Sequence, residues 1–146
     1  MSDLVHIPVL LSRTLDLLNL RTEAHVIDTT LGLGGHSLEI LKRIGPKGKL
    51  MAFEQDDKNL KQAQKNLKAF ESQILYVPKN FEHLKEEVER LGFQPVQAIL
   101  FDLGLSSPHL DDPERGFSFL RQGPLDMRFD SRQPLTAADL VNQSSE

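Results

Sequence analysis

A glycine-rich run near the N-terminus is the segment most suited to holding a ligand. It is Asp28-Thr29-Thr30-Leu31-Gly32-Leu33-Gly34-Gly35-His36, and it lies between an apolar segment and a segment with helical spacing. Glycines in such a turn let a ligand approach the backbone, and the free amides at the start of the helix face that ligand. The run therefore predicts a cofactor-binding turn. The alternative is a tight strand-to-helix turn without a ligand.

The spacing within this turn narrows the kind of cofactor. In the dinucleotide fingerprint a third glycine allows close packing of helix and strand, but Ser37 stands at that position here. This departure argues against NAD and FAD, and so against a nicotinamide-dependent oxidoreductase. The carboxylate of Asp28, ahead of the glycines, is expected either to accept hydrogen bonds from the loop or to attract a cationic group of the ligand.

A second acid follows the next apolar segment. Glu54 stands 22 residues beyond Gly32, close to the offset of about 20 residues at which Rossmann-type folds place an acid on the ribose hydroxyls. Two carboxylate oxygens suit the two hydroxyls of a vicinal diol. Asp56 could supply that carboxylate instead, and a solvated acid at a strand end is the alternative for Glu54.

Three further candidate residues follow later apolar segments. Phe81 could pack its ring on an adenine or staple the following helix to the core. Asp102 directly follows the fourth apolar segment, which places it beside the glycine turn, where open α/β sheets bind ligands. It could hydrogen-bond a cofactor, hold an attacking amine or cap a helix. His109, in the same loop, could contact cofactor or substrate, or lie in solvent.

The segments around these residues alternate between strand and helix, which predicts an α/β fold with a parallel sheet covered by helices on both faces. The expected strands are 24–28, 50–53, 74–77 and 96–101. The expected helices are 8–18, 36–44, a segment capped by Asp56 or Asp57 that carries the apolar stripe 60–70, and 82–91. Leu84, Val88 and Leu91 are expected to face the sheet, and strand 96–101 to be buried on both faces.

From Leu103 onward the alternation stops, and Gly, Pro, Ser, Asp and Arg dominate a long irregular segment of the kind that is usually functional. Thr136-Ala137-Ala138-Asp139 resembles a capping box and predicts one last helix. Acids outnumber arginines in 110–146, so charge by itself does not indicate a phosphate clamp. An ion pair between Arg128 and Asp126 is favoured over an RNA contact.

Composition bounds the chain further. Its 146 residues, 39% hydrophobic and 26% charged, fit one globular domain. The absence of cysteine excludes disulfides and thiolate zinc sites, and the five histidines are scattered, so no metal is expected. The net charge of −4 gives no global argument for nucleic acid. No signal or transit segment is expected at residues 1–6, and no membrane span anywhere.

Several longer motifs resemble one known family. They are His6-Ile7-Pro8-Val9-Leu10-Leu11, Gly32-Leu33-Gly34-Gly35-His36-Ser37, Asp102-Leu103-Gly104-Leu105-Ser106-Ser107, Leu110-Asp111-Asp112-Pro113-Glu114-Arg115-Gly116-Phe117-Ser118-Phe119 and Gln122-Gly123-Pro124-Leu125-Asp126-Met127-Arg128. From His6 to about Asn142 the chain resembles the MraW family, also called RsmH. The last two motifs are long and unusual, which makes a chance match very improbable.

This resemblance implies a Rossmann-like class I methyltransferase that uses S-adenosyl-L-methionine to methylate the N4 amine of a cytidine in small-subunit ribosomal RNA, in a bacterial cytoplasm or an organelle. Carried over position by position, the family's donor contacts are Gly34, Gly35, His36, Glu54, Phe81, Asp102 and His109. Asp102, or a water near it, is also the candidate group that polarises or deprotonates the amine. Glu54 stands where the family usually has Asp, and His109 often corresponds to Gln.

The resemblance also divides the chain. Residues 1–109 are expected to be the N-terminal part of the methyltransferase domain, and residues 110–146 the start of an inserted helical substrate-recognition subdomain. The family continues well past residue 146 with strands that close the sheet, so we expect a fragment whose open sheet edge promotes self-association. The competing interpretation is a non-catalytic module or remnant that keeps part of the donor site. The expected partner is small-subunit ribosomal RNA or the small ribosomal subunit.

Overall fold

The computed structural model describes residues 8–144, so the expectations for residues 1–6 and for the start of the His6 motif lie outside the described residues. Four strands, β1 (His25–Asp28), β2 (Lys49–Phe53), β3 (Ile74–Val77) and β4 (Ala98–Leu100), form one sheet. Their order is β3-β2-β1-β4, and all three pairings are parallel. The predicted α/β fold with a parallel sheet is confirmed.

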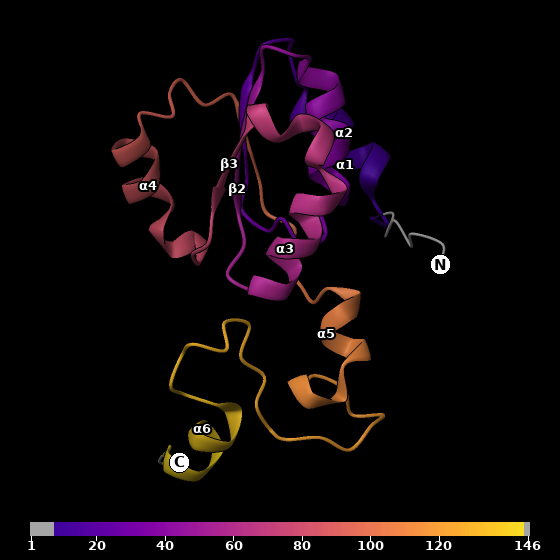
Figure 1. Cartoon of the computed structure of the whole chain (residues 1–146), viewed down its shortest axis with the longest axis vertical. Helices are drawn as coiled ribbons and strands as arrows, with labels where there is room; N and C mark the ends of the chain where they lie inside the picture. The colour runs from indigo at the N-terminus through magenta and orange to yellow at the C-terminus, as the bar shows by residue number, and fades with distance from the viewer. Residues whose placement is uncertain (1–7, 145–146) are drawn as a thin grey trace. The chain divides into compact units, whose positions relative to one another are not determined.

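Helices cover both faces of this sheet (Figure 1). On one side lie α1 (Leu11–Leu18), α2 (Gly35–Ile44) and α3 (Asp57–Asn66), and on the other lies α4 (Leu84–Leu91). Two short 3-10 helices, η1 (Lys68–Gln73) and η2 (Phe81–His83), complete the crossovers after α3 and β3. After β1 the chain adds β2 and β3 on one side of that strand, and it then crosses back to add β4 on the other side. The order in which strands are added therefore reverses between β1 and β4.

Alternation along the strands explains the two cores. Val26, Leu50 and Ala52 are buried under α1–α3, whereas Ile27, Met51 and Phe53 are buried on the α4 side. Successive side chains of a strand point to opposite faces, so a strand covered on both sides is apolar at every position.

The helix boundaries follow local signals. Asp56 caps α3 by accepting hydrogen bonds from the backbone N–H of Lys58 (2.8 Å) and of Asn59 (3.1 Å), as a short acidic side chain at this position does in general. Gly92 ends α4 with a left-handed φ of 60°. Of the two caps considered for α3, the structure uses Asp56, and Asp57 is its first residue.

Several details differ from the sequence predictions. The first helix begins at Leu11 rather than at residue 8, and Val9 and Leu10 before it are exposed. The apolar stripe after Asp56 is divided between α3 and the 3-10 helix η1. In α4 it is Glu87, not Leu91, that is fully buried, because Lys79 and Arg90 both bind its carboxylate. The strand predicted over 96–101 has only three paired residues.

β4 also departs from the prediction that it is buried on both faces. Among the described residues it pairs with β1 alone and is therefore an edge strand. Leu100 is buried against the α1–α3 side, but Ile99 is 41% exposed and Phe101 50% exposed. The segment is apolar, as predicted, but in the described chain its second face is only partly covered, with the ring of Phe81 lying edge-on to Phe101.

Contacts within the chain separate a first compact unit, up to Leu103, from a second that begins at Gly104. The second unit contains α5 (Ser107–Asp111), η3 (Pro113–Arg115) and α6 (Ala137–Gln143), of which only α6 was predicted. The capping box at its start is confirmed, because Thr136 and Asp139 exchange hydrogen bonds.

The inside of the second unit is held by arginines. Arg115 donates to the backbone carbonyls of Arg128 (2.8 Å) and Phe129 (3.1 Å). The predicted ion pair between Arg128 and Asp126 is present, with a closest N–O distance of 2.7 Å. Hydrogen bonds from the side chain and the backbone N–H of Arg128 hold the pKa of Asp126 at about 2. The arginines therefore serve as internal cross-links of a segment that has little regular secondary structure.

Candidate functional site

The glycine run forms the turn between β1 and α2. The N–H of Leu31 donates to the carbonyl of Phe53 (3.0 Å), which ties the turn to the end of β2. Gly34 caps α2 with φ +88°, and a Cβ there would stand 2.9 Å from Cδ1 of the buried Leu67. Both the backbone conformation and the space require glycine at this position, so the turn keeps its backbone bare.

Asp28, at the end of β1, is buried and bound to the loop that follows it. Its two carboxylate oxygens accept hydrogen bonds from the Oγ of Ser37 (2.7 Å) and the N–H of Thr30 (3.1 Å). Burial raises the pKa of Asp28, and these two hydrogen bonds lower it only in part. Of the two roles considered for this acid, the structure gives it the first, because its carboxylate faces the loop and not an open site.

Ser37 explains why the third glycine of the dinucleotide fingerprint is missing. Its side chain is fully buried and fills the space between helix and strand with a hydroxyl that donates to Asp28. A glycine at this position would leave one carboxylate oxygen of Asp28 without its partner, and burying an unpaired acceptor is costly.

Glu54, just beyond β2, is held by backbone from both sides. Its Oε2 accepts from the N–H of Gly32 (2.9 Å), and its Oε1 accepts from the N–H of Asp56 (2.9 Å). The structure thus brings Glu54 to the glycine turn, as the sequence spacing predicted. The carboxylate of Asp56 instead caps α3. A carboxylate has two acceptor oxygens, which suits the two hydroxyls of a vicinal diol.

Asp102 lies at the same end of the sheet, after β4. Its backbone N–H donates to the Oγ1 of Thr30 (2.8 Å) in the glycine turn. Its carboxylate, on a side chain that is 58% exposed, lies 3.3 Å from Nδ1 of His36. Asp102 and His36 therefore face each other at the point where the chain reverses direction across the sheet, the usual place for a ligand in open α/β folds.

His36 is nearly buried at the start of α2, and its Nε2 has no hydrogen-bond partner in the described part of the chain. A buried polar atom without a partner is uncommon in native proteins. With Nδ1 occupied by Asp102, the free Nε2 is the atom of this histidine that a ligand could satisfy.

Phe81 begins η2 after β3. It packs against the core on the α4 side and lies edge-on to Phe101, with ring centroids 5.6 Å apart and planes at 89°. The side chain is only partly buried, so the packing that staples η2 to the sheet leaves part of the ring exposed. Both roles considered for Phe81 are thus compatible with its position.

His109 belongs to the second unit, and the structure does not place it relative to the residues above. It is buried in α5, where Nδ1 lies 3.2 Å from the N of Ser106 and its ring is 5.2 Å from that of Phe117 and 4.9 Å from that of Phe129. The alternative of a loop histidine in solvent is wrong, because two aromatic rings enclose the imidazole.

Thr30 is the residue of this site that the sequence analysis missed. Its N–H and its Oγ1 connect Asp28 to Asp102 across two neighbouring strands. The only sequence signal was a hydroxyl residue in the loop after β1, which is too common to single out a position. No group of three or more His, Asp or Glu suited to a metal is found among the described residues. In the same part of the chain, no helix is long and apolar enough to cross a membrane.

The model of the MraW methylase family matches residues 3–146. The chain belongs to the MraW methylase family. The cofactor that such a family implies is S-adenosyl-L-methionine, and the bare glycine turn, the braced Glu54 and the unpartnered Nε2 of His36 fit a ligand of that kind.

Relatives of this chain support the same assignment. One is the ribosomal RNA small subunit methyltransferase H of Mycoplasmopsis synoviae, 52% identical over 137 residues, which are 94% of this chain and 45% of that protein. The chain thus spans less than half the length of this curated relative.

Solved structures show the fold. A candidate rRNA methylase from Clostridium thermocellum matches with a TM-score of 0.61 at 21% identity, over 70% of this chain and 55% of that one. A protein-L-isoaspartate O-methyltransferase matches with a TM-score of 0.55 at 19% identity, over 67% of this chain and 30% of that one. The chain therefore shares its fold with these two methyltransferases.

Proposed function

We propose that this chain carries the methyl-donor site of an S-adenosyl-L-methionine-dependent ribosomal RNA methyltransferase, whose product is N4-methylated cytidine in the small-subunit RNA. The observation that carries the proposal is the meeting of four features at the carboxyl ends of β1, β2 and β4. These are the bare glycine turn, the carboxylate of Glu54, the imidazole of His36 and the exposed carboxylate of Asp102. The cytosine amine comes from the family resemblance alone.

The proposed donor contacts divide by chemistry. The carboxylate of Glu54 takes the ribose hydroxyls, since hydrogen bonds from Gly32 and Asp56 hold it at the glycine turn. Gly34 and Gly35 offer backbone without side chains at the start of α2. His36 presents Nε2, and the exposed part of Phe81 offers a ring for the adenine. His109 stays a proposed contact through the resemblance. When bound, S-adenosyl-L-methionine supplies a methyl group on a positively charged sulfur.

Asp102 is proposed as a donor contact, through the resemblance, and also as the catalytic group. An exocyclic cytosine amine is a weak nucleophile because its lone pair is delocalised into the ring, so it has to be held in line with the methyl group. The carboxylate of Asp102 can accept a hydrogen bond from the amine and then the proton that the amine loses. His36, 3.3 Å away, and the Thr30 hydroxyl that binds the Asp102 backbone hold this carboxylate in place. The target base has to leave its stack to reach it.

The donor site is tested first by calorimetry. Glu54→Gln is expected to weaken S-adenosyl-L-methionine binding about 10- to 100-fold, because a hydrogen bond to a charged group contributes about 1.5–3 kcal/mol. Glu82→Gln, at an exposed acid of η2, is the matched control and is expected to leave binding unchanged. Binding of NAD in preference to the methyl donor would overturn the proposal.

Methyl transfer is tested with tritium-labelled donor and small ribosomal subunits that lack the modification. Asp102→Asn is expected to reduce transfer by a protein of the relatives' full length without weakening donor binding in proportion. The competing function is a non-catalytic donor-binding module. It is supported if the 146-residue chain binds the donor but transfers no methyl group, while the longer protein does transfer it.

We also propose that the edge strand β4 lets this chain associate with itself. Its outer backbone groups have no strand partner in the described chain, and Ile99 and Phe101 expose apolar surface beside them. Sedimentation is expected to be concentration-dependent, and Ile99→Lys is expected to abolish that dependence. Leu17→Lys, at an equally apolar exposed site on α1, is the control. A wild-type monomer at all concentrations would contradict the idea.

The proposed function also includes a role for the second unit and a cellular compartment. We propose that residues 110–146 begin an inserted substrate-recognition subdomain, since the long motifs of the family resemblance lie there and the unit is compact on its own. A ribosomal RNA substrate would put the activity in the cytoplasm. If a protein that lacks residues 110–146 binds ribosomal RNA as tightly as the intact protein does, this role is wrong.

A further inference from the structure

A hollow lies on α3, and none of the residues proposed for the donor lines it. It has a volume of about 600 Å³ and lies over the junction of α3, η1 and the edge strand β3. We call it the α3 groove. Its lining residues are Lys61, Gln64, Lys65, Lys68, Glu71, Ile74 and Tyr76. Its size falls in the range of about 300–1,000 Å³ that is typical of ligand sites.

Three lysines follow one side of this groove. Lys61, Lys65 and Lys68 are spaced four and three residues apart, so they lie on one face of the helical segment. At a helical rise of 1.5 Å per residue, Lys61 and Lys65 are about 6 Å apart along the axis. All three are exposed. The arrangement is a row of cations rather than a single charge.

These ammonium groups differ from several other cations of the first unit. Lys42, Lys47 and Arg43 each form an ion pair with an acid of the same unit. Lys61, Lys65 and Lys68 form no side-chain hydrogen bond or ion pair with any residue that the structure describes. Glu71 is the acid among the lining residues, so the lining carries a net charge of about +2 on a chain whose total is −4. The row is therefore a local basic surface whose net positive charge can bind an anion.

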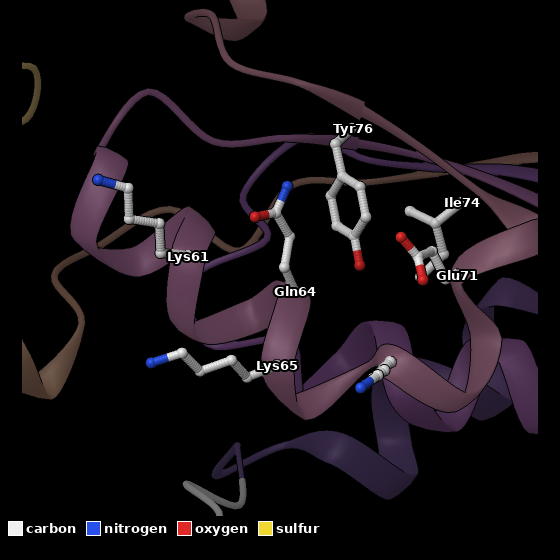
Figure 2. Close-up of a pocket in the computed structure, with 7 residues that line it drawn as sticks. Lys61, Gln64, Lys65, Glu71, Ile74 and Tyr76 are labelled. Carbon is white, nitrogen blue, oxygen red and sulfur yellow. The ribbon is translucent and has the colours of Figure 1, made fainter.

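The other lining residues make the groove more than a charged surface. Ile74 is buried at its base, and Tyr76 is partly buried. In Figure 2 the Tyr76 ring lies between Gln64 and Glu71, while Lys61 and Lys65 extend on the far side of Gln64 from Glu71. Burial raises the pKa of the Tyr76 hydroxyl, and Glu71 raises it further, so the hydroxyl stays a hydrogen-bond donor. An aromatic ring, an amide and a hydroxyl thus stand beside the lysine row.

We propose that the α3 groove binds a single-stranded segment of RNA, with the phosphates on Lys61, Lys65 and Lys68 and a nucleotide seated against Tyr76 and Gln64. The partner follows from the proposed function, on which this inference rests, and from charge complementarity. Single-stranded nucleic acids are recognised by a basic track with an aromatic side chain beside it. A duplex would present its phosphates but keep its bases stacked, and the concave floor would then stay empty.

The groove is joined to the proposed donor site through α3 and the residue that follows it. The side chain of Asn66 donates to the carbonyl of Leu33 in the glycine turn (2.9 Å), and Leu67 packs under Gly34. RNA held on the outer face of this segment is therefore attached to the same piece of backbone that supports the turn. The groove could therefore anchor the RNA substrate without occupying the proposed donor site.

The test is the salt dependence of RNA binding. The triple variant Lys61→Gln, Lys65→Gln, Lys68→Gln is compared with wild type by fluorescence anisotropy, using a labelled 12-nucleotide single-stranded oligouridine between about 50 and 200 mM salt. Three lost phosphate contacts are expected to weaken binding about tenfold at low salt. They are also expected to reduce the slope of log K against log salt by about 2, since each contact to a single strand contributes about 0.7.

The matched control removes three positive charges elsewhere on the same unit, by Lys42→Gln, Arg43→Gln and Lys47→Gln. It is expected to leave affinity and slope near those of wild type. Equal losses in both variants would overturn the proposal, because net charge alone would then explain binding. So would an equal effect of the triple variant on polyglutamate, which would indicate an acidic protein as the partner, or on a 12-base-pair RNA duplex.

The result is separable from that of the proposed function. Binding of S-adenosyl-L-methionine, measured by calorimetry, is expected to be the same in wild type and in the triple variant, because no lysine of the row is a proposed donor contact. If the wild-type chain does not bind the donor while the triple variant still loses RNA affinity and slope, the donor proposal fails and the groove stands. If the donor binds and the slope does not change, the groove fails.

Discussion

Replacing Gly34 by alanine would test the tightest point of the glycine turn. Gly34 has φ +88°, and its Cβ would stand 2.9 Å from Cδ1 and 3.1 Å from Cγ of the fully buried Leu67. An L residue in the left-handed region costs about 1–2 kcal/mol, and an extra methyl group in a packed core costs about 1–3 kcal/mol. We expect Gly34→Ala to lower the free energy of unfolding by about 2–5 kcal/mol, a large share of the 5–15 kcal/mol typical of a domain.

Gly92→Ala is the matched control for this substitution. Gly92 ends α4 with φ 60° and ψ 33°, and no atom lies within 4 Å of the position that its Cβ would take. It is therefore expected to show only the backbone cost, about 1–2 kcal/mol. Urea unfolding followed by circular dichroism gives both values, and their difference measures the collision with Leu67.

Equal losses in the two variants would refute this account of the turn, because they would mean that Leu67 moves aside at no cost. Calorimetry at low temperature, where both variants are folded, separates stability from function. Gly34→Ala is expected to weaken S-adenosyl-L-methionine binding more than Gly92→Ala does. The same donor affinity in both variants would show that this turn does not hold the donor.

Two other substitutions test the supports described above. Thr30→Val removes the hydroxyl that binds the Asp102 N–H and is expected to cost about 0.5–1.5 kcal/mol of stability by urea unfolding. Its larger effect should be on methyl transfer, and transfer at the wild-type rate would mean that this hydrogen bond does not position Asp102. Glu87→Gln is expected to destabilise the fold at pH 7, because it takes the anion from between Lys79 and Arg90.

The pH dependence of the Glu87 variant follows from the direction of its shift. Hydrogen bonds from Arg90 and Lys79 lower the pKa of Glu87 from 4.5 to about 2 in the folded chain. The stability that it contributes is complete above its unfolded pKa and is lost as the pH falls from about 4.5 toward 2. The difference in unfolding free energy between wild type and Glu87→Gln should therefore shrink over that interval. A difference that is constant from pH 7 to pH 3 would show that the charge of Glu87 contributes nothing.

The sequence predicted those parts of the fold that depend on neighbours along the chain. The cap at Asp56, the end of α4 at Gly92 and the capping box at Thr136 are all local interactions, and their residues stand a few positions apart. The approach of Glu54 to Gly32 was also predictable, because two parallel neighbouring strands carry their following loops to the same edge.

What could not be predicted depends on contacts between different elements that no strand pairing or capping pattern in the sequence indicates. The burial of Glu87 requires Lys79 on a different element, and the enclosure of His109 requires Phe117 and Phe129. The exposure of Ile99 depends on which element, if any, lies outside β4. The lysine row was present in the sequence as a spacing of four and three. Its significance became visible only when Tyr76 was found beside it.

The two hydrogen bonds that hold Glu54 have a thermodynamic consequence. A free glutamate side chain rotates about three bonds, and ordering such a chain costs up to about 1.5–2 kcal/mol. Here the N–H groups of Gly32 and Asp56 already fix both oxygens, so that entropy is lost when the chain folds and not when a ligand arrives. The carboxylate of Glu54 thereby links the glycine turn to the loop after β2. Preorganisation of this kind makes binding tighter without adding a contact to the ligand.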